Sequence, residues 1–271
     1  MTPFAERLAR VVDARGPLCV GIDPHAAVLG EWGLPDDASG ARELGLRVVE
    51  AAAGRIGVVK PQVAFFERHG AAGYAALEDV LAAARSAGLL VIADVKRGDV
   101  GSTVDAYGEA WLTPGGPLEA DAMTAVAYQG FGSLSGVVDR AAAHGKGVFV
   151  LAATSNPESA EVQTLRTPEG VTIAQRMVEH AAASGGSVGV VVGATVDLAG
   201  VGIDPIALAT VPVLAPGYGA QGARLADAPA VFGAALARVL PNVSRSVLRA
   251  GPDDVASAIG EAAAEVASWP R

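Results

Sequence analysis

The residues best suited to chemistry stand together in the segment Asp94-Val-Lys96-Arg-Gly-Asp99-Val-Gly-Ser-Thr103. The segment follows an apolar run at residues 89–93, which is short and aliphatic and therefore predicts a buried strand. Because side chains alternate along a strand, Asp94 and Lys96 are expected on one face. Two carboxylates around one ammonium at the end of a buried strand are costly unless the three groups act together. The segment therefore predicts a functional site.

Lysine is rare in this chain, with three residues against seventeen arginines. An ammonium group can donate a proton or act as a compact charge, whereas a guanidinium practically never loses its proton. A lysine at the end of a strand therefore indicates a role that arginine, the usual cation of this chain, does not fill. We predict functional roles for Lys60 and Lys96, with a structural ion pair to Asp94 as the alternative for Lys96. Lys146 lies in a turn flanked by glycines and is expected to be solvated.

Composition limits the class of protein. At 271 residues, the chain has about the length of one α/β barrel. It is 51% hydrophobic and 18% charged, which allows a large core. The net charge of −9 disfavours nucleic acid and anionic membranes as partners but leaves room for a small anionic substrate in one cationic pocket.

The expected compartment is the cytoplasm. The single cysteine, Cys19, excludes a disulfide framework, fits a reducing environment and is expected to be a small buried hydrophobe. Residues 2–16 predict an amphipathic helix rather than a signal peptide. The longest uncharged stretch, residues 205–223, contains three prolines and cannot form a continuous membrane helix.

Short aliphatic runs alternate with alanine-rich amphipathic segments along the chain. The predicted strands cover residues 18–23, 56–60, 89–96, 121–126, 147–153, 187–193, 211–215 and 239–245, of which the last is weak because it contains Pro241. The predicted helices cover residues 38–53, 66–86, 103–111, 131–144, 168–184, 197–208, 224–237 and 253–268. This alternation predicts parallel strands buried on both faces. We expect a single-domain (β/α)8 TIM barrel over residues 1–271, with an open doubly wound sheet as the alternative.

Polar side chains gather where the predicted strands end, which is where such barrels carry their chemistry. They are Asp23, Lys60, Asp94, Lys96, the pair Thr154-Ser155 and Arg245. For Asp23, capping of the next element and ribose binding are equally good interpretations. Ser155 is interpreted either as a helix cap or as a site residue. The four histidines have no metal-ligand spacing and are expected at the surface or in packing, so no metal site is predicted.

The segment Gly217-Tyr-Gly-Ala-Gln221-Gly222 formally matches the pattern G-x-G-x-x-G. It follows a late strand, and no acidic residue stands about 20 positions further on, so a dinucleotide site is disfavoured. Barrels often bind phosphate with the loops after strands 7 and 8. We therefore predict a phosphate loop assisted by a helix N-terminus near Arg224 and by Arg245, with a plain turn as the alternative.

Together these motifs resemble the orotidine 5′-phosphate decarboxylase family. The resemblance rests on Asp94-x-Lys96-x-x-Asp99 with Gly101-Ser-Thr103, on Val20-Gly-Ile-Asp23-Pro, on Lys60-Pro-Gln and on Pro216-Gly-x-Gly-Ala-Gln221-Gly. The chain length and the Lys-Arg-Gly-Asp form are similar to the longer bacterial, type 2 branch. Two departures affect local geometry: residues 124–129 lack the Pro-Tyr pair usual after strand 4, and Pro241 lies in strand 8.

The resemblance implies a homodimeric barrel that converts orotidine 5′-monophosphate to uridine 5′-monophosphate and CO2, the last step of de novo pyrimidine nucleotide biosynthesis, without metal or organic cofactor. It implies an alternating charge network, with Asp99 entering the partner's site and Lys96 protonating C6 of the pyrimidine. The network comprises Lys60, Asp94, Lys96 and Asp99. By the same resemblance, the ribose is held by Asp23, Lys60 and the partner's Thr103, the base by Ser155, and the phosphate by Gln221 and Arg245.

Two other functions remain open at this point. The first is a sugar-phosphate enzyme of the same barrel superfamily that uses Mg²⁺ to stabilise an enediolate, because such proteins share Asp-x-Lys-x-x-Asp. The second is a nucleotide-binding regulator that kept the fold and lost catalysis. Gln221 and the full set of four charged residues favour the nucleotide enzyme over the first. The intact charge network argues against the second, because binding alone does not need Lys96.

Overall fold

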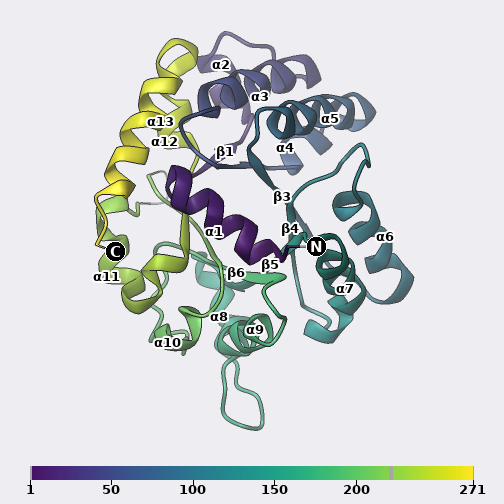
Figure 1. The fold of residues 1–271 in the computed structure, drawn as a ribbon, viewed down its shortest axis with the longest axis vertical. Helices are drawn as coiled ribbons and strands as arrows, with labels where there is room; N and C mark the ends of the chain where they lie inside the picture. Colours follow the sequence, from purple (N-terminus) through teal and green to yellow (C-terminus); the bar gives the residue numbers. More distant parts are fainter. Residues whose placement is uncertain (1, 220–221, 271) are drawn as a thin grey trace.

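A computed structural model describes residues 2–219 and 222–270 of the chain. Eight parallel strands close into a barrel in sequence order, each paired with the next and the last with the first (Figure 1). The strands are β1 (Cys19–Ile22), β2 (Val58–Pro61), β3 (Leu90–Arg97), β4 (Ala122–Ala125), β5 (Gly147–Ala153), β6 (Val188–Val192), β7 (Val213–Pro216) and β8 (Val239–Val243). The predicted single-domain (β/α)8 barrel is confirmed, and the open sheet is excluded.

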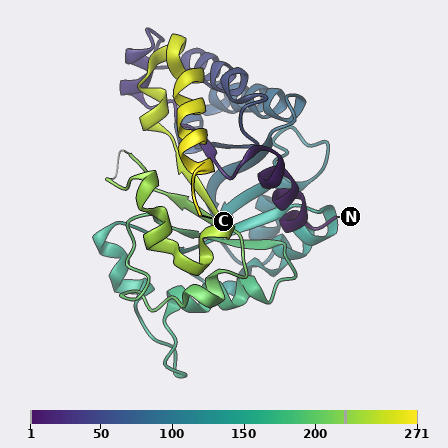
Figure 2. The same cartoon turned by 60° about the vertical axis from the view of Figure 1, so that its left-hand side comes forward.

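Helices surround the barrel, as expected for parallel strands joined by crossovers (Figures 1 and 2). The α-helices are α1 (Phe4–Arg15), α2 (Ala26–Glu31), α3 (Ala38–Ala52), α4 (Ala64–Glu67), α5 (Gly70–Ser86), α6 (Gly101–Leu112), α7 (Ser135–His144), α8 (Ala160–Gln163), α9 (Ile173–Ala182), α10 (Pro205–Leu208), α11 (Ala228–Phe232), α12 (Arg245–Leu248) and α13 (Gly251–Ala267). Short 3-10 turns are η1 (Phe131–Leu134), η2 (Pro157–Ser159), η3 (Leu225–Asp227) and η4 (Gly233–Arg238). Within the described part of the chain, no helix has the length and apolar character needed to span a membrane.

Three predicted helices are wrong in extent. The helix expected over residues 168–184 begins only at Ile173, because the Thr172 hydroxyl accepts a hydrogen bond from Gln175 N at 3.1 Å and caps it there. The segment before it projects from the barrel in both views (Figures 1 and 2). Residues 197–204 are not helical, and α10 starts at Pro205 after the left-handed Gly202. Within residues 224–237, the single expected helix is replaced by η3, α11 and η4, and α11 ends before Gly233, which has φ 47°.

The weakly predicted eighth strand is present despite its proline. In β8, Pro241 pairs with Ala215 of β7, whereas the pairing with β1 uses only Asn242 and Val243. Proline has no N–H to donate, so it is tolerated where a ladder does not depend on that donor. The short ladder that closes the barrel therefore begins after Pro241.

Helix α1 fills the amino-terminal end of the barrel. It lies across that end in Figure 1, and Phe4 and Leu8 belong to one apolar cluster with the barrel interior. The Phe4 ring packs edge-on against Phe149 with 5.9 Å between centroids. A Cβ at Gly147 would lie 2.4 Å from the Phe4 ring, so only glycine leaves room for this packing. The barrel is thus packed at this end, and its open end is the carboxyl end.

The prediction that Lys146 is solvated is wrong. Lys146 is 6% exposed, and its Nζ lies 2.6 Å from Glu119 Oε1 and 3.8 Å from Asp121 Oδ1. Asp121 also pairs with Arg7 of α1 at 2.5 Å. A buried ammonium needs such partners to offset its lost hydration. These partners come from segments distant in sequence, so the turn composition around Lys146 could not reveal them.

Candidate active site

A cavity of about 330 Å³ opens at the carboxyl ends of the strands. Its volume is at the lower end of the range typical of small-molecule sites, about 300–1,000 Å³. Six of the nine predicted site residues line it: Asp23, Lys60, Asp94, Lys96, Ser155 and Arg245. The strand-end placement of polar residues in the sequence thus picked out side chains that line one cavity.

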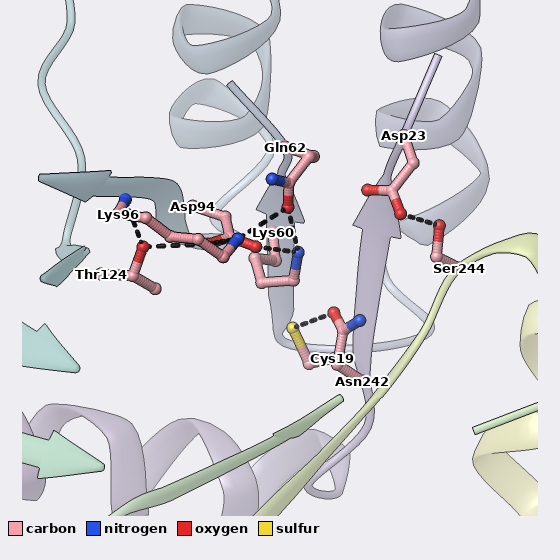
Figure 3. A network of polar contacts seen from close by, with 9 residues as sticks. All are labelled: Cys19, Asp23, Lys60, Gln62, Asp94, Lys96, Thr124, Asn242 and Ser244. Carbon is pink, nitrogen blue, oxygen red and sulfur yellow. Dashed lines mark hydrogen bonds and ion pairs between the residues drawn. The ribbon is translucent and has the colours of Figure 1, made fainter. Parts of the chain in front are cut away.

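Asp94 lies between Lys60 and Lys96 (Figure 3), and all three residues line the cavity. Its Oδ2 accepts a hydrogen bond from Lys60 Nζ at 2.9 Å, and its Oδ1 accepts one from Lys96 Nζ at 2.6 Å. The side chains of Lys60 and Asp94 are 4% and 9% exposed, whereas that of Lys96 is 43% exposed. The array is therefore a buried ion pair extended by one ammonium that remains accessible.

The lysines keep the buried carboxylate ionised. Burial alone would raise the pKa of Asp94, but attraction to Lys60 and Lys96 outweighs it and lowers the pKa to about 2. Burial works in the opposite sense on Lys60, where the negative charges of Asp94 and Asp23 outweigh it and raise the pKa above its usual value. Both members of the buried pair are therefore charged at neutral pH.

Two neutral side chains complete the array, and the sequence interpretation gave neither a role. Gln62 is best oriented with its amide nitrogen donating to Asp94 Oδ2 and its oxygen accepting from Lys96 Nζ at 3.1 Å. The Thr124 hydroxyl donates to Asp94 Oδ1 at 2.9 Å. The sequence could have indicated Gln62, because it stands two positions after Lys60 and therefore lies on the same face of the strand. For Thr124, the only indication in the sequence was a polar residue within a short apolar strand.

Two side-chain hydrogen bonds join β1 and β8, one beyond the carboxyl ends of the strands and one from the first residue of β1 (Figure 3). Ser244 Oγ donates to Asp23 Oδ2 at 2.5 Å, and Cys19 Sγ donates to Asn242 Oδ1 at 3.4 Å. Burial raises the pKa of the Cys19 thiol to about 12, which fits the expected inert, buried residue. Among the described residues, Asp23 Oδ1 has no hydrogen-bond partner although it is buried. That oxygen is an unsatisfied acceptor on a residue that lines the cavity.

Comparisons with known proteins identify the family. The family model for orotidine 5′-phosphate decarboxylase / HUMPS matches residues 16–259. The chain belongs to this family. Orotidine 5′-phosphate decarboxylases from Streptomyces coelicolor and Salinispora tropica are each 53% identical to it over 262 residues, covering 93% and 94% of this chain and 92% and 93% of theirs.

A solved structure agrees with the family assignment. The crystal structure of a Streptomyces avermitilis protein assigned as an orotidine 5′-phosphate decarboxylase superposes with a TM-score of 0.94. It is 49% identical in sequence and covers 99% of this chain and 96% of its own. The resemblance read from the motifs is therefore confirmed at the level of family and fold.

Two residues expected from the decarboxylase family do not line the cavity of their own chain. Asp99 and Thr103 do not line it: Asp99 Oδ1 accepts from Val100 N at 2.8 Å, and Thr103 is exposed in the first turn of α6. Gln221 lies outside the described residues. Arg224 stands at the N-cap of the 3-10 helix η3, near a helix N-terminus as predicted, and its exposed guanidinium pairs with Asp227 at 2.6 Å. Arg245 lines the cavity at the start of α12.

The departures from the decarboxylase pattern leave the strands intact. The segment after β4 carries Tyr128, which is 81% exposed, and β4 itself pairs regularly with β5 through four residue pairs.

Two of the histidines pack against aromatic rings. The ring centroids of His25 and Phe65 are 5.3 Å apart, and those of His180 and Phe131, which are stacked, are 4.6 Å apart. In residues 2–219 and 222–270, no group of three or more His, Cys, Asp or Glu side chains is arranged to hold a metal ion.

We expect Asp94 to titrate near pH 2 in the folded protein, measured by ¹³C NMR of side-chain carboxyl groups, with Asp94→Asn assigning the resonance. Because its folded pKa lies below its usual 3.8, ionised Asp94 stabilises the fold above about pH 4, and this contribution disappears as the pH falls towards 2. This contribution to the free energy of unfolding is about 2 kcal/mol. A midpoint at or above 3.8 in folded protein would contradict this electrostatic description.

Proposed function

We propose that this chain decarboxylates orotidine 5′-monophosphate to uridine 5′-monophosphate and CO2, completing de novo pyrimidine nucleotide synthesis. The observation that carries the proposal is the Lys60–Asp94–Lys96 array that lines the cavity. Relatives that are 53% identical over nearly the whole chain are named for this activity. The reaction requires no metal or organic cofactor in this proposal.

Lys96 is the proposed proton donor. When the bond from C6 to the carboxylate breaks, its electron pair stays on C6 as a carbanion with little resonance stabilisation. An ammonium about 4 Å away stabilises that charge by roughly 4 kcal/mol at an effective dielectric constant near 20. The carbanion then takes a proton from Nζ, which leaves a neutral amine. The Lys96 side chain is 43% exposed, so water can return the proton.

Asp94 is proposed to position Lys96. Each of its oxygens already accepts from an ammonium group and from a neutral donor, Thr124 at Oδ1 and Gln62 at Oδ2. A carboxylate neutralised in this way repels a substrate carboxylate less than an isolated one. Of the two roles considered for Asp94, positioning of the ammonium is therefore better supported than electrostatic repulsion of the substrate.

The remaining cavity residues are proposed to bind the parts of the nucleotide that do not react. Asp23, with its unsatisfied Oδ1, and Lys60 would hold the ribose, and Ser155 would contact the base. Arg245 would bind the 5′-phosphate with bidentate geometry, with Gln221 as the second contact predicted from sequence. Binding energy from these remote groups orients the pyrimidine and is used to lower the barrier at C6.

We further propose that two chains form a dimer in which Asp99 and Thr103 serve the partner's cavity. Both lie outside the cavity of their own chain. Two large hydrophobic side chains are exposed beside them, Val100 at 55% and Tyr128 at 81%. They flank the close backbone approach of Gly98 to Val126, where a Cβ on the glycine would lie 2.1 Å from the carbonyl oxygen. A dimer interface at this face would bury both side chains.

A steady-state assay with orotidine 5′-monophosphate tests the reaction by following the loss of pyrimidine absorbance. We expect turnover by the purified protein that persists after treatment with a chelator. Turnover that disappears with the chelator would favour the Mg²⁺-dependent sugar-phosphate class instead. Folded protein that binds uridine 5′-monophosphate but shows no turnover would favour a nucleotide-binding regulator.

A further inference from the structure

The backbone at Lys96 has a conformation that residues with a side chain rarely adopt. Its φ is 48°, and among residues 2–219 and 222–270 it is the one non-glycine residue with positive φ. This conformation brings the Cβ close to the backbone and costs free energy. It persists only where the surrounding structure imposes it. A neighbouring group must therefore hold the backbone of Lys96.

An irregularity in β3 explains how Lys96 comes to need such support. The ladder between β3 and β4 pairs Ala93 with Met123 and then Arg97 with Ala125. Four steps along β3 are thus matched by two along β4, and the residues between them bulge out of the ladder. Within the bulge, the Lys96 amide donates to a side chain, the Thr124 hydroxyl, at 2.9 Å.

Thr124 is the residue of β4 between the two paired positions, and it is 1% exposed. Its Oγ1 accepts from Lys96 N and donates to Asp94 Oδ1, each at 2.9 Å. Asp94 Oδ1 in turn accepts from Lys96 Nζ at 2.6 Å. One hydroxyl therefore closes a ring that contains the backbone and the ammonium of the same lysine (Figure 3).

We propose that Thr124 is a positioning residue that fixes both ends of Lys96, an inference that rests on the proposed decarboxylation. Its acceptor side holds the left-handed backbone, and its donor side holds the carboxylate that orients the ammonium. The single hydroxyl proton is committed to Asp94, so Thr124 cannot also donate to a substrate without breaking the ring. Loss of the hydroxyl should therefore impair the reacting step more than nucleotide binding.

The variant Thr124→Val removes the hydroxyl and keeps the volume and the β-branch. We expect kcat to fall by about 10²-fold, because a misplacement of about 1 Å at a reacting group has an effect of that size. KM and the dissociation constant for uridine 5′-monophosphate should stay within about threefold, since an interaction that acts only in the transition state leaves ground-state binding unchanged. Thr124→Ser should recover kcat to within about tenfold of wild type because it restores the hydroxyl.

A matched control is Thr210→Val, which removes an exposed hydroxyl that donates to Ala207 O at 2.7 Å outside the cavity. It should leave kcat and KM unchanged. The proposal is overturned if Thr124→Val keeps kcat within about threefold of wild type. It is also overturned if Thr124→Ser is no better than Thr124→Val, or if nucleotide binding weakens as much as kcat falls.

A crystal structure of Thr124→Val tests the same inference without using activity. Lys96 should leave the left-handed region, and the contact of its Nζ with Asp94 should lengthen. An unchanged Lys96 backbone and ion pair would overturn the positioning role. Wild-type protein without turnover would instead refute the proposed decarboxylation, and the crystal structure would still decide whether Thr124 holds Lys96.

Discussion

Lys96→Ala is expected to abolish measurable turnover while the protein stays folded and binds uridine 5′-monophosphate. The ammonium contributes roughly 4 kcal/mol of charge stabilisation, equivalent to about 10³-fold in rate, and its loss also removes the proton donor. The fold should tolerate the change because Asp94 keeps its buried partner Lys60 at 2.9 Å. Steady-state kinetics, circular dichroism and nucleotide binding measured on one preparation check these expectations.

Two further variants sharpen the interpretation of Lys96→Ala. Lys96→Arg keeps the positive charge but practically cannot release a proton, so it should also be severely impaired. Arg10→Ala removes an exposed cation of α1 outside the cavity, and it should behave as wild type. Substantial residual turnover in Lys96→Ala or Lys96→Arg would exclude Lys96 as the proton donor.

A mixture of inactive Lys96→Ala and inactive Asp99→Ala subunits is expected to regain activity. In a hybrid dimer, one cavity receives Lys96 from one chain and Asp99 from the other, whereas the second cavity lacks both. Random exchange between equal amounts makes half of the dimers hybrids, so about one quarter of the wild-type sites are intact in a two-fold symmetric dimer. Activity measured after exchange should approach that fraction.

The control for the mixture is each variant alone under the same exchange conditions, which should stay inactive. Exchange itself is followed with subunits of different mass or label. If exchange is complete and no activity returns, Asp99 does not act across an interface. If Asp99→Ala alone is fully active, Asp99 has no role in the reaction.

Much of the fold was predictable because the strands are nearly continuous aliphatic runs. All eight predicted strands are present, since a parallel sheet buried on both faces requires such runs and little else in the chain resembles them. The helices were harder where glycine and proline interrupt amphipathic segments, as at residues 197–208. There, composition favoured a helix, but Gly202 and Pro205 confine it to the last four residues.

The sequence predicted which strand ends carry the polar residues of the candidate site, but it did not predict the side-chain contacts between strands. Alternation along β3 correctly predicted that Asp94 and Lys96 would be neighbours, although a bulge and not a regular strand brings them together. Thr124 and Ser244 were missed because their roles depend on side-chain contacts between strands. Such contacts leave no periodic trace in a single sequence. The same reason explains why the buried partners of Lys146 were missed.

The packing of α1 at the amino-terminal end of the barrel bears on where ligands enter and leave. The apolar cluster that contains Phe4 and Leu8 also contains Val191 and Leu214, which line the cavity. Apolar side chains therefore fill the barrel between α1 and the site, and the cavity with the polar array opens at the carboxyl ends of the strands. We therefore expect nucleotide to enter, and nucleotide and CO2 to leave, at the carboxyl ends of the strands.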